Sequence, residues 1–328
     1  MHQEAYVDHL LKLAKLDDES VTPAQTPYRH GFPIDSIPKQ EPAKNQKKLT
    51  HYMQSLVGSL NWLAISTRPD IATVTNILAK YMSSPNSHHI AAAKRVIKYL
   101  KGTKDRGITF TSRINSTLNS FIKFPTNKSI LSMCDSNWGP QDASKPKPGK
   151  EEELCLFKTR SISGYLLWTN GPLHWQSKRQ TITARSTAEA EIYATDECIK
   201  ALLHLDQLVT GLKLQQQIMP KPNIVYNDNA ACVAWSKNTT TKGLRHIQIR
   251  DNAVRESIQD GFANVLHVAG NMNLADLFTK EDRDDKHFMA IRDILVTARR
   301  LTLCPLHPRR CQVGSTLQTT HRISNATS

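Results

Sequence analysis

The chain has 328 residues, of which 39% are hydrophobic, and its 43 Lys and Arg against 29 Asp and Glu give a formal net charge of +14. This length predicts two domains of roughly 100–200 residues each, and the modest hydrophobic content predicts a real core with poorly folded ends. The sequence contains neither a signal-peptide-like segment nor a run of about 18 apolar residues, which argues against a secreted or membrane protein. The positive charge favours a polyanionic partner such as nucleic acid.

The cysteines and histidines form no metal-binding pattern. The six cysteines lack paired C-x-x-C spacing, and the 13 histidines are dispersed along the chain. We therefore expect neither a zinc site nor a disulfide framework. Reduced thiols in an intracellular compartment are the simpler interpretation.

The first third of the chain predicts a small helical subdomain. A helix is expected at residues 5–16 and a Pro-rich polar connector at residues 20–45. From about Leu49 to Gly102 apolar residues recur at helical spacing, with Pro69 at a helix start and Pro85 between two helices. Six basic residues near the end of this region could line a nucleic-acid groove or lie on a solvated face, and the sequence leaves both open. They are Lys94, Arg95, Lys98, Lys101, Lys104 and Arg106.

Strands and helices alternate in the next region, with a polar loop at residues 138–159 and an Asn170-Gly171 hairpin signal. The expected strands lie at residues 108–118, 130–135, 163–169, 172–176, 224–228 and 263–268. The expected helices lie at residues 188–212, 230–236, 244–259 and 274–280. This order predicts a mixed sheet with helices on its faces.

Four acidic residues lie where such a sheet can bring them together. Asp135 and Asp228 end apolar strands, Glu191 lies early in the long helix, and Asp276 follows the last strand. Each one alone would more often be a solvated residue or a cap, so the joint placement carries the argument. Converging carboxylates repel one another unless hard cations neutralise them, and oxygen ligands suit Mg²⁺ or Mn²⁺. Two such ions about 3.5–4 Å apart can clamp the attacking and leaving oxygens of a phosphodiester.

Eight short segments, in the same order, resemble the C-terminal part of a copia-type retrotransposon Pol polyprotein over roughly residues 5–283. They are Val57–Leu63, Thr67–Ile71, Ala93–Thr103, Arg160–Tyr165, Trp175–Gln180, Ser186–Glu191, Asp228–Ala231 and Ala275–Lys280. The resemblance covers the end of a reverse transcriptase followed by a ribonuclease H domain.

The resemblance implies an α/β fold, with a ribonuclease H-like mixed sheet flanked by helices after a small, mostly helical thumb or connection subdomain. Residues 1–106 would form that subdomain, including the connector at residues 20–45. Residues 107–283 would form the ribonuclease H-like domain. Residues 284–328 would be a degenerate, disordered tail.

The implied activity is hydrolysis of the RNA strand of RNA–DNA hybrids during reverse transcription, with two Mg²⁺ or Mn²⁺ ions. Asp135 and Asp276 would hold one ion and its nucleophilic water. Asp135 would also contact the second ion, which Glu191 and Asp228 complete. All four residues would thus be catalytic residues and metal ligands.

The implied partners are the hybrid and, if a longer polyprotein supplies them, the palm and fingers of the reverse transcriptase. Lys178, Arg179 and Arg185 are candidate contacts to the nucleic-acid backbone. Asn229, next to Asp228, could bind a 2′-hydroxyl or phosphate, and an ordinary turn role is equally open. The expected location is a cytoplasmic virus-like particle or the nucleus.

Two nearby residues compete with these assignments. Glu189 is the main rival of Glu191, but about 200° of helix rotation separates them, so only one can face the sheet. The Ile-Tyr-Ala that follows favours Glu191. His267 could assist product release, as a histidine does in several ribonucleases H. It falls inside a strand pattern, so we expect a structural role instead.

The sequence also departs from the family. It contains no Tyr-x-Asp-Asp, so we expect no DNA synthesis by this chain alone. Gln248, Asn252 and Ala253 replace an acid, a histidine and an aromatic of the family pattern, and losing a buried phenyl group typically costs about 3–5 kcal/mol. Two alternatives therefore stay open: an inactive nucleic-acid-binding remnant of a decayed element, and a product that does not fold stably.

Overall fold

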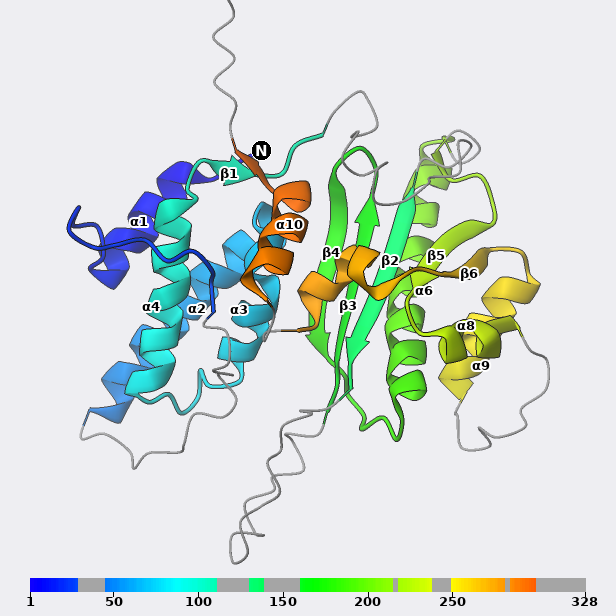
Figure 1. Ribbon diagram of the computed structural model, residues 1–328, viewed down its shortest axis with the longest axis horizontal. Helices are drawn as coiled ribbons and strands as arrows, with labels where there is room; N and C mark the ends of the chain where they lie inside the picture. The colour runs from blue at the N-terminus through cyan, green and yellow to red at the C-terminus, as the bar shows by residue number, and fades with distance from the viewer. Residues whose placement is uncertain are drawn as a thin grey trace, which may run out of the picture. The chain divides into compact units, whose positions relative to one another are not determined.

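The computed structural model describes residues 1–28, 45–110, 130–138, 160–214, 218–237, 249–280 and 284–298. Residues 1–298 belong to one compact unit, which contains a helical part and a five-stranded sheet (Figure 1). None of the helices in the described ranges combines the length and the apolar character that crossing a bilayer requires.

The helical part confirms the expected helices of the first third of the chain. Its four α-helices are α1 (Glu4–Ala14), α2 (Gln46–Ser66), α3 (Ala72–Ala79) and α4 (Ser87–Gly102). Pro69 opens a short 3-10 helix, η2 (Pro69–Ile71), where its missing N–H needs no partner. Asn86 caps α4 by accepting the backbone N–H of His89, whose ring in turn accepts the N–H of Asn86.

A buried ion pair, with its hydrogen bonds, joins the Thr67–Ile71 segment to the Ala93–Thr103 segment. The Arg68 guanidinium donates to both carboxylate oxygens of Asp70, at 2.9 and 2.8 Å, and to the backbone and side-chain oxygens of Thr103. The Tyr99 hydroxyl also donates to Asp70. Burial alone would raise the pKa of Asp70, but the guanidinium and these hydrogen bonds lower it below its ordinary value. The pair therefore stays charged and ties η2 to the end of α4.

Most of the basic residues near α4 bind groups of the protein itself. Lys101 donates to the carbonyls of Leu16 and Asp18, and Arg95 donates to the Thr26 hydroxyl. Lys104 forms ion pairs with Glu4 and Asp8, and Arg106 forms one with Asp293. These contacts favour a structural role over a nucleic-acid groove for these four residues.

The five-stranded sheet has the order β4-β3-β2-β5-β6. Its strands are β2 (Leu131–Asn137), β3 (Ile162–Trp168), β4 (Pro172–Arg179), β5 (Asn223–Asn227) and β6 (Ala263–His267). The pairs β2–β3 and β3–β4 are antiparallel, whereas β2–β5 and β5–β6 are parallel. The fold class is therefore confirmed as a mixed α/β sheet, which is the ribonuclease H-like arrangement that the resemblance implied.

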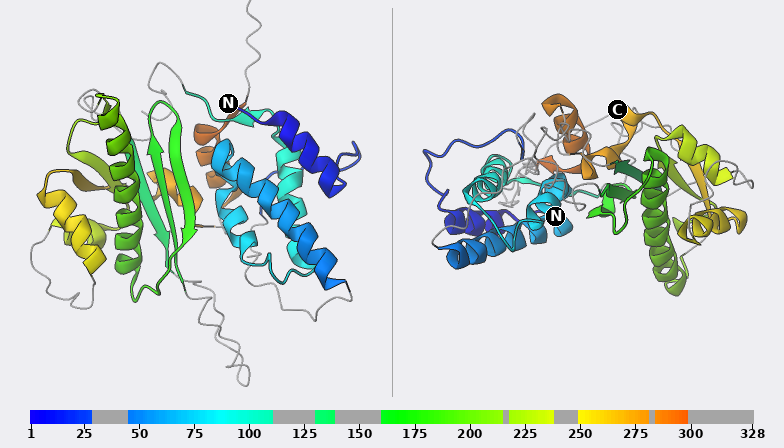
Figure 2. Two further views of the ribbon diagram at one scale, coloured as in Figure 1. Left: turned by 180° about the vertical axis from the view of Figure 1, so that it is seen from behind. Right: turned by 90° about the horizontal axis from the view of Figure 1, so that it is seen from below.

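Helices cover both faces of this sheet, as the two opposite views show (Figures 1 and 2). One face packs against α6 (Thr187–Gly211), with Cys134, Tyr165 and Leu167 in the shared core. The other face packs against the orange segment that contains η6 (Leu274–Phe278), and there Leu131 and Met133 join Phe278 in the core. Strands buried on both faces explain the nearly continuous apolar runs in the sequence. The other helices that the structure describes in this region are α8 (Ala230–Lys237), α9 (Ile249–Gln259) and η5 (Gly270–Met272).

The last described segment corrects the expected tail. Residues 284–298 form α10 (Asp285–Leu295) and the short strand β7 (Thr297–Ala298). Phe288, Ile291, Ile294 and Leu295 of α10 are buried in the same core as the helical part, and the Phe288 ring contacts Tyr28 and Tyr99 edge-on. The tail prediction was wrong here because the charged residues around Phe288 hid an amphipathic helix.

Other boundaries also differ from the expectation. The strand expected at residues 108–118 is not present at residues 108–110, and its remainder lies outside the described residues. Instead β1 (Arg106–Gly107) pairs with β7 in a separate two-stranded sheet. The expected helix at residues 274–280 is the 3-10 helix η6. The polar loop, most of the Pro-rich connector and residues 299–328 lie outside the described part of the chain.

Candidate active site

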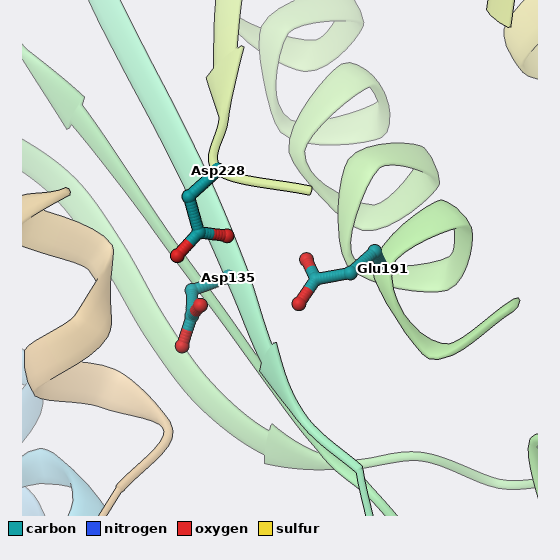
Figure 3. Close-up of side chains that lie close together, drawn as sticks. All are labelled: Asp135, Glu191 and Asp228. Carbon is teal, nitrogen blue, oxygen red and sulfur yellow. The ribbon is translucent and has the colours of Figure 1, made fainter. Parts of the chain in front are cut away.

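Three of the four expected acidic residues meet at one end of the sheet (Figure 3). Asp135 lies near the end of β2, Asp228 directly follows β5, and Glu191 lies early in α6. One carboxylate oxygen of each lies within 4.8 Å of the others. Because β2 and β5 are parallel neighbours, their carboxyl ends bring the two aspartates to the same edge.

The Glu191 carboxylate is buried and held on both oxygens. Oε1 accepts the backbone N–H of Ser136 at 3.1 Å, and Oε2 accepts the side-chain N–H of Asn227 at 3.0 Å. Burial first, and then the negative charge of Asp135, raise the pKa of Glu191 well above its ordinary value. A cation bound nearby would favour the ionised form of Glu191. An all-oxygen donor set of this charge fits a hard divalent ion such as Mg²⁺ or Mn²⁺.

Glu191, and not Glu189, belongs to this group. The Glu189 carboxylate instead accepts the backbone N–H of Arg185 at 2.6 Å, and its own N–H donates to the Ser186 hydroxyl. These are the contacts of a residue in the first turn of a helix. The helix register expected from the sequence thus agrees with the geometry.

Asp276 is buried but does not join the group of three. Its carboxylate contacts the Lys280 ammonium and lies 3.2 Å from Nε2 of His287 in α10. The Lys280 ammonium also lies 4.0 Å from Oδ2 of Asp135, and the Thr279 hydroxyl donates to that same oxygen. Asp276 is therefore linked to Asp135 through Lys280, and its catalytic role stays a prediction.

Gly164 allows η6 to lie this close to Asp135. Gly164 pairs with Asp135 across β2 and β3, and a Cβ atom at Gly164 would lie 2.6 Å from Phe278 Cβ and 2.8 Å from Thr279 Cγ2. Real Cβ atoms essentially never come that near, so any side chain at this position displaces η6. This contact gives a physical reason for the glycine in the Arg160–Tyr165 segment.

Gly164→Ala is expected to destabilise the fold by about 1–3 kcal/mol, as overpacking does. It should also reduce any cleavage activity, because Thr279 and Lys280 move with η6. Urea denaturation together with a hybrid-cleavage assay measures both effects. Gly58→Ala in α2 is the matched control, since its Cβ meets nothing within 4 Å and should stabilise the helix by about 0.5–1 kcal/mol. Equal behaviour of the two variants would contradict the packing argument.

The four expected nucleic-acid contacts have different surroundings. Lys178 on β4 is exposed, with its ammonium 3.8 Å from Glu197, and Arg179 is half-buried beside it. Arg185 is exposed next to the N-cap of α6. Asn229 has a structural role, since its side-chain oxygen accepts the backbone N–H of Cys232 at 2.9 Å in the first turn of α8. All four contacts to nucleic acid stay predictions.

Two other expectations concern neighbouring residues. His267 is exposed at the end of β6, where Nε2 lies 3.0 Å from the backbone oxygen of Asp228. Ala253 and Asn252 are exposed on α9, so the expected loss of a buried aromatic at Ala253 is wrong. Gln248 lies outside the described residues.

Four further residues at the site were not predicted from the sequence. Asn227 contacts Glu191, Thr279 contacts Asp135, and both Lys280 and His287 contact Asp276. Local signals were available for three of them, because Asn227 directly precedes Asp228, and Thr279 and Lys280 end the Ala275–Lys280 segment. The contacts themselves join residues up to 144 positions apart, which no local pattern reports.

Comparisons with known proteins agree with the eight sequence segments. No protein-family model matches the chain. The retrovirus-related Pol polyprotein from transposon TNT 1-94 of Nicotiana tabacum is 27% identical over 284 residues, which cover 85% of this chain and 19% of that protein. The corresponding polyprotein from transposon RE2 of Arabidopsis thaliana is 30% identical over 229 residues, 69% of this chain and 14% of that protein. The chain thus spans about a fifth or less of the length of these relatives.

A search of solved structures found the ribonuclease H1 LC11, isolated from compost, at 17% identity and a TM-score of 0.33 over 48% of this chain. The family assignment depends on the polyproteins, three of which cover 69–85% of the chain. By sequence the chain thus corresponds to a part of the retrovirus-related Pol polyproteins of copia-type transposons.

Proposed function

We propose that this chain is a ribonuclease H that hydrolyses the RNA strand of RNA–DNA hybrids with two divalent ions during reverse transcription. The group of Asp135, Glu191 and Asp228, in which the first two residues are buried and Asp228 is half-buried, carries the proposal. Three carboxylates with oxygens within 4.8 Å of one another favour cation binding, because a cation neutralises their mutual repulsion.

The residues divide into ligands and groups that orient them. Asp135, Glu191 and Asp228 would hold one Mg²⁺ or Mn²⁺ ion, and Asp135 with Asp276 would hold the other. Such ions polarise the scissile phosphodiester, lower the pKa of a bound water and stabilise the leaving oxygen. Thr279 orients Asp135 through its hydroxyl, and the backbone N–H of Ser136 orients Glu191.

The chain would bind its substrate through charge and shape. A net charge of +14 supports attraction to nucleic acid, with Lys178, Arg179 and Arg185 as candidate contacts to phosphates. We propose no DNA synthesis by this chain alone, because its sequence contains no Tyr-x-Asp-Asp. A reverse-transcriptase palm and fingers from a longer polyprotein would act beside it, in a virus-like particle or in the nucleus.

One observation favours a second candidate, an inactive nucleic-acid-binding remnant. Asp276 is paired with Lys280 and His287 and stands outside the group of three. If this pairing persists when divalent ions are present, only one ion would bind and hydrolysis would fail.

A cleavage assay decides between the two candidates. The full chain is incubated with an RNA–DNA hybrid labelled on the RNA strand, in Mg²⁺, in Mn²⁺ and in EDTA. The proposed enzyme cuts the RNA of the hybrid only with a divalent ion and spares single-stranded RNA and duplex DNA. A folded chain that binds the hybrid and cuts it under none of these conditions is the remnant.

Hybrid binding should be sensitive to salt and nearly indifferent to sequence. Phosphate contacts by Lys and Arg release counterions, so affinity should fall by about tenfold or more between about 50 and 200 mM salt. Fluorescence anisotropy with two hybrids of unrelated sequence measures both properties, with Ca²⁺ in place of Mg²⁺ to prevent cleavage. A flat salt response would remove the electrostatic part of the proposal.

A further inference from the structure

Asn227, the last residue of β5, contacts three residues around the acidic group. Its side chain is fully buried, at 0% exposure. Its nitrogen Nδ2 lies 3.0 Å from Glu191 Oε2, 3.3 Å from Thr195 Oγ1 and 3.4 Å from Cys134 Sγ. One carboxamide thus connects β5 with α6 and with β2.

Hydrogen bonding fixes which end of the Asn227 amide faces Glu191. Oδ1 accepts the backbone N–H of Asn229 at 2.7 Å, and an amide nitrogen cannot accept at that position. The NH₂ end therefore points to Glu191. The Thr195 hydroxyl can accept from it, because it donates its own hydrogen to the backbone oxygen of Glu191 at 2.9 Å.

Glu191 is thereby held from two strands. The backbone N–H of Ser136 in β2 contacts Oε1, and the side chain of Asn227 in β5 contacts Oε2. The Ser136 contact is a backbone one that every residue except proline would supply. The Asn227 contact depends on the side chain, so it is the one that a substitution can remove.

We propose that Asn227 is a positioning residue that holds the Glu191 carboxylate in the orientation required to bind a divalent ion. This inference rests on the proposed function. Groups that hydrogen-bond to metal ligands fix the orientation of those ligands, and losing one typically weakens metal binding about 10–100-fold. Within the described part of the chain, Asn227 supplies the one side-chain hydrogen bond to Oε2, and its removal leaves that oxygen without it.

The chain offers a matched control in the same strand. Asn223 begins β5, is also buried, and donates its side-chain N–H to the backbone oxygen of Phe262 at 3.1 Å. Asn223→Ala removes a buried carboxamide hydrogen bond without touching the acidic group. Any loss of ion binding that follows from a weakened β5 should therefore appear in this variant too.

The test measures Mn²⁺ binding to the full chain without nucleic acid, by electron paramagnetic resonance of the free ion. Asn227→Ala should weaken Mn²⁺ binding about tenfold or more, whereas Asn223→Ala should leave it within about twofold. In a Glu191→Gln background, Asn227→Ala should produce no further weakening, because the residue acts through Glu191. Circular dichroism of each variant reports folding.

Unchanged Mn²⁺ binding in Asn227→Ala overturns the inference, and so does a weakening of equal size in the Glu191→Gln background. If Asn227→Ala does not fold, Asn227→Thr takes its place, because threonine keeps a hydroxyl donor and suits a strand. It is measured alone and in the Glu191→Gln background. Its Mn²⁺ binding should weaken less than that expected for Asn227→Ala. Mn²⁺ binding that is insensitive to Glu191→Gln overturns the ligand assignment itself. If the Mn²⁺ measurements give the expected results but the chain cleaves no hybrid, the proposed activity is overturned and the role of Asn227 is not.

Discussion

Asp135→Asn is expected to lower cleavage of the RNA strand in a hybrid by at least about 10³-fold while hybrid binding stays nearly unchanged. The metal ions of such a site supply several kcal/mol of transition-state stabilisation, and each decade in rate corresponds to about 1.4 kcal/mol. Asp135 is the residue that both proposed ion positions share. The amide keeps the shape of the side chain but removes a negative charge from the group.

The same variant should fold at least as stably as the parent chain in the absence of divalent ions. Burial and the charge of Asp135 raise the pKa of Glu191, so the two carboxylates repel each other when both are ionised. The asparagine removes this repulsion, and its oxygen can still accept the Thr279 hydroxyl. Thermal unfolding in EDTA measures the effect, and an unfolded variant would show that lost activity reflects lost structure.

Glu189→Gln is the matched control for this prediction. The Glu189 carboxylate accepts the backbone N–H of Arg185, and a glutamine oxygen can accept it as well. Activity should therefore stay close to that of the parent chain. An inactive Glu189→Gln variant beside an active Asp135→Asn variant would show that the wrong carboxylates have been assigned.

The group of three acids could be predicted because each lies beside a clear local signal. Asp135 and Asp228 stop apolar runs that the structure confirms as β2 and β5. Glu191 follows the Ser186 N-cap by five residues, and this spacing determines the face of α6 on which Glu191 lies. Parallel pairing of the two strands then places both aspartates at one edge.

The surroundings of Asp276 could not be predicted in the same way. They depend on His287, and α10, the helix that carries it, was mistaken for part of a tail. Two residues that contact Phe288 of α10 are Tyr28 and Tyr99, which lie in the first third of the chain. Such long-range packing overrides local composition.

The Thr67–Ile71 segment is similarly recognisable in sequence, but its role is visible only in the fold. Arg68 and Asp70 are nearly inaccessible to solvent, and their partners Tyr99 and Thr103 lie in another of the eight segments. A buried charge that loses its partner typically destabilises a protein by about 3–5 kcal/mol, because the remaining charge is left without compensation. Asp70→Ala should therefore lower the free energy of unfolding by about that amount.

A double substitution separates this explanation from a simple loss of contacts. Arg68→Met with Asp70→Leu removes both charges and keeps apolar volume, so it should cost far less than Asp70→Ala alone. Asp8→Ala, which removes one of the two exposed partners of Lys104, should cost no more than about 1 kcal/mol. Urea denaturation of the three variants measures these differences. A double variant at least as unstable as Asp70→Ala would mean that the shape of this network, rather than its charge, stabilises the junction between η2 and α4.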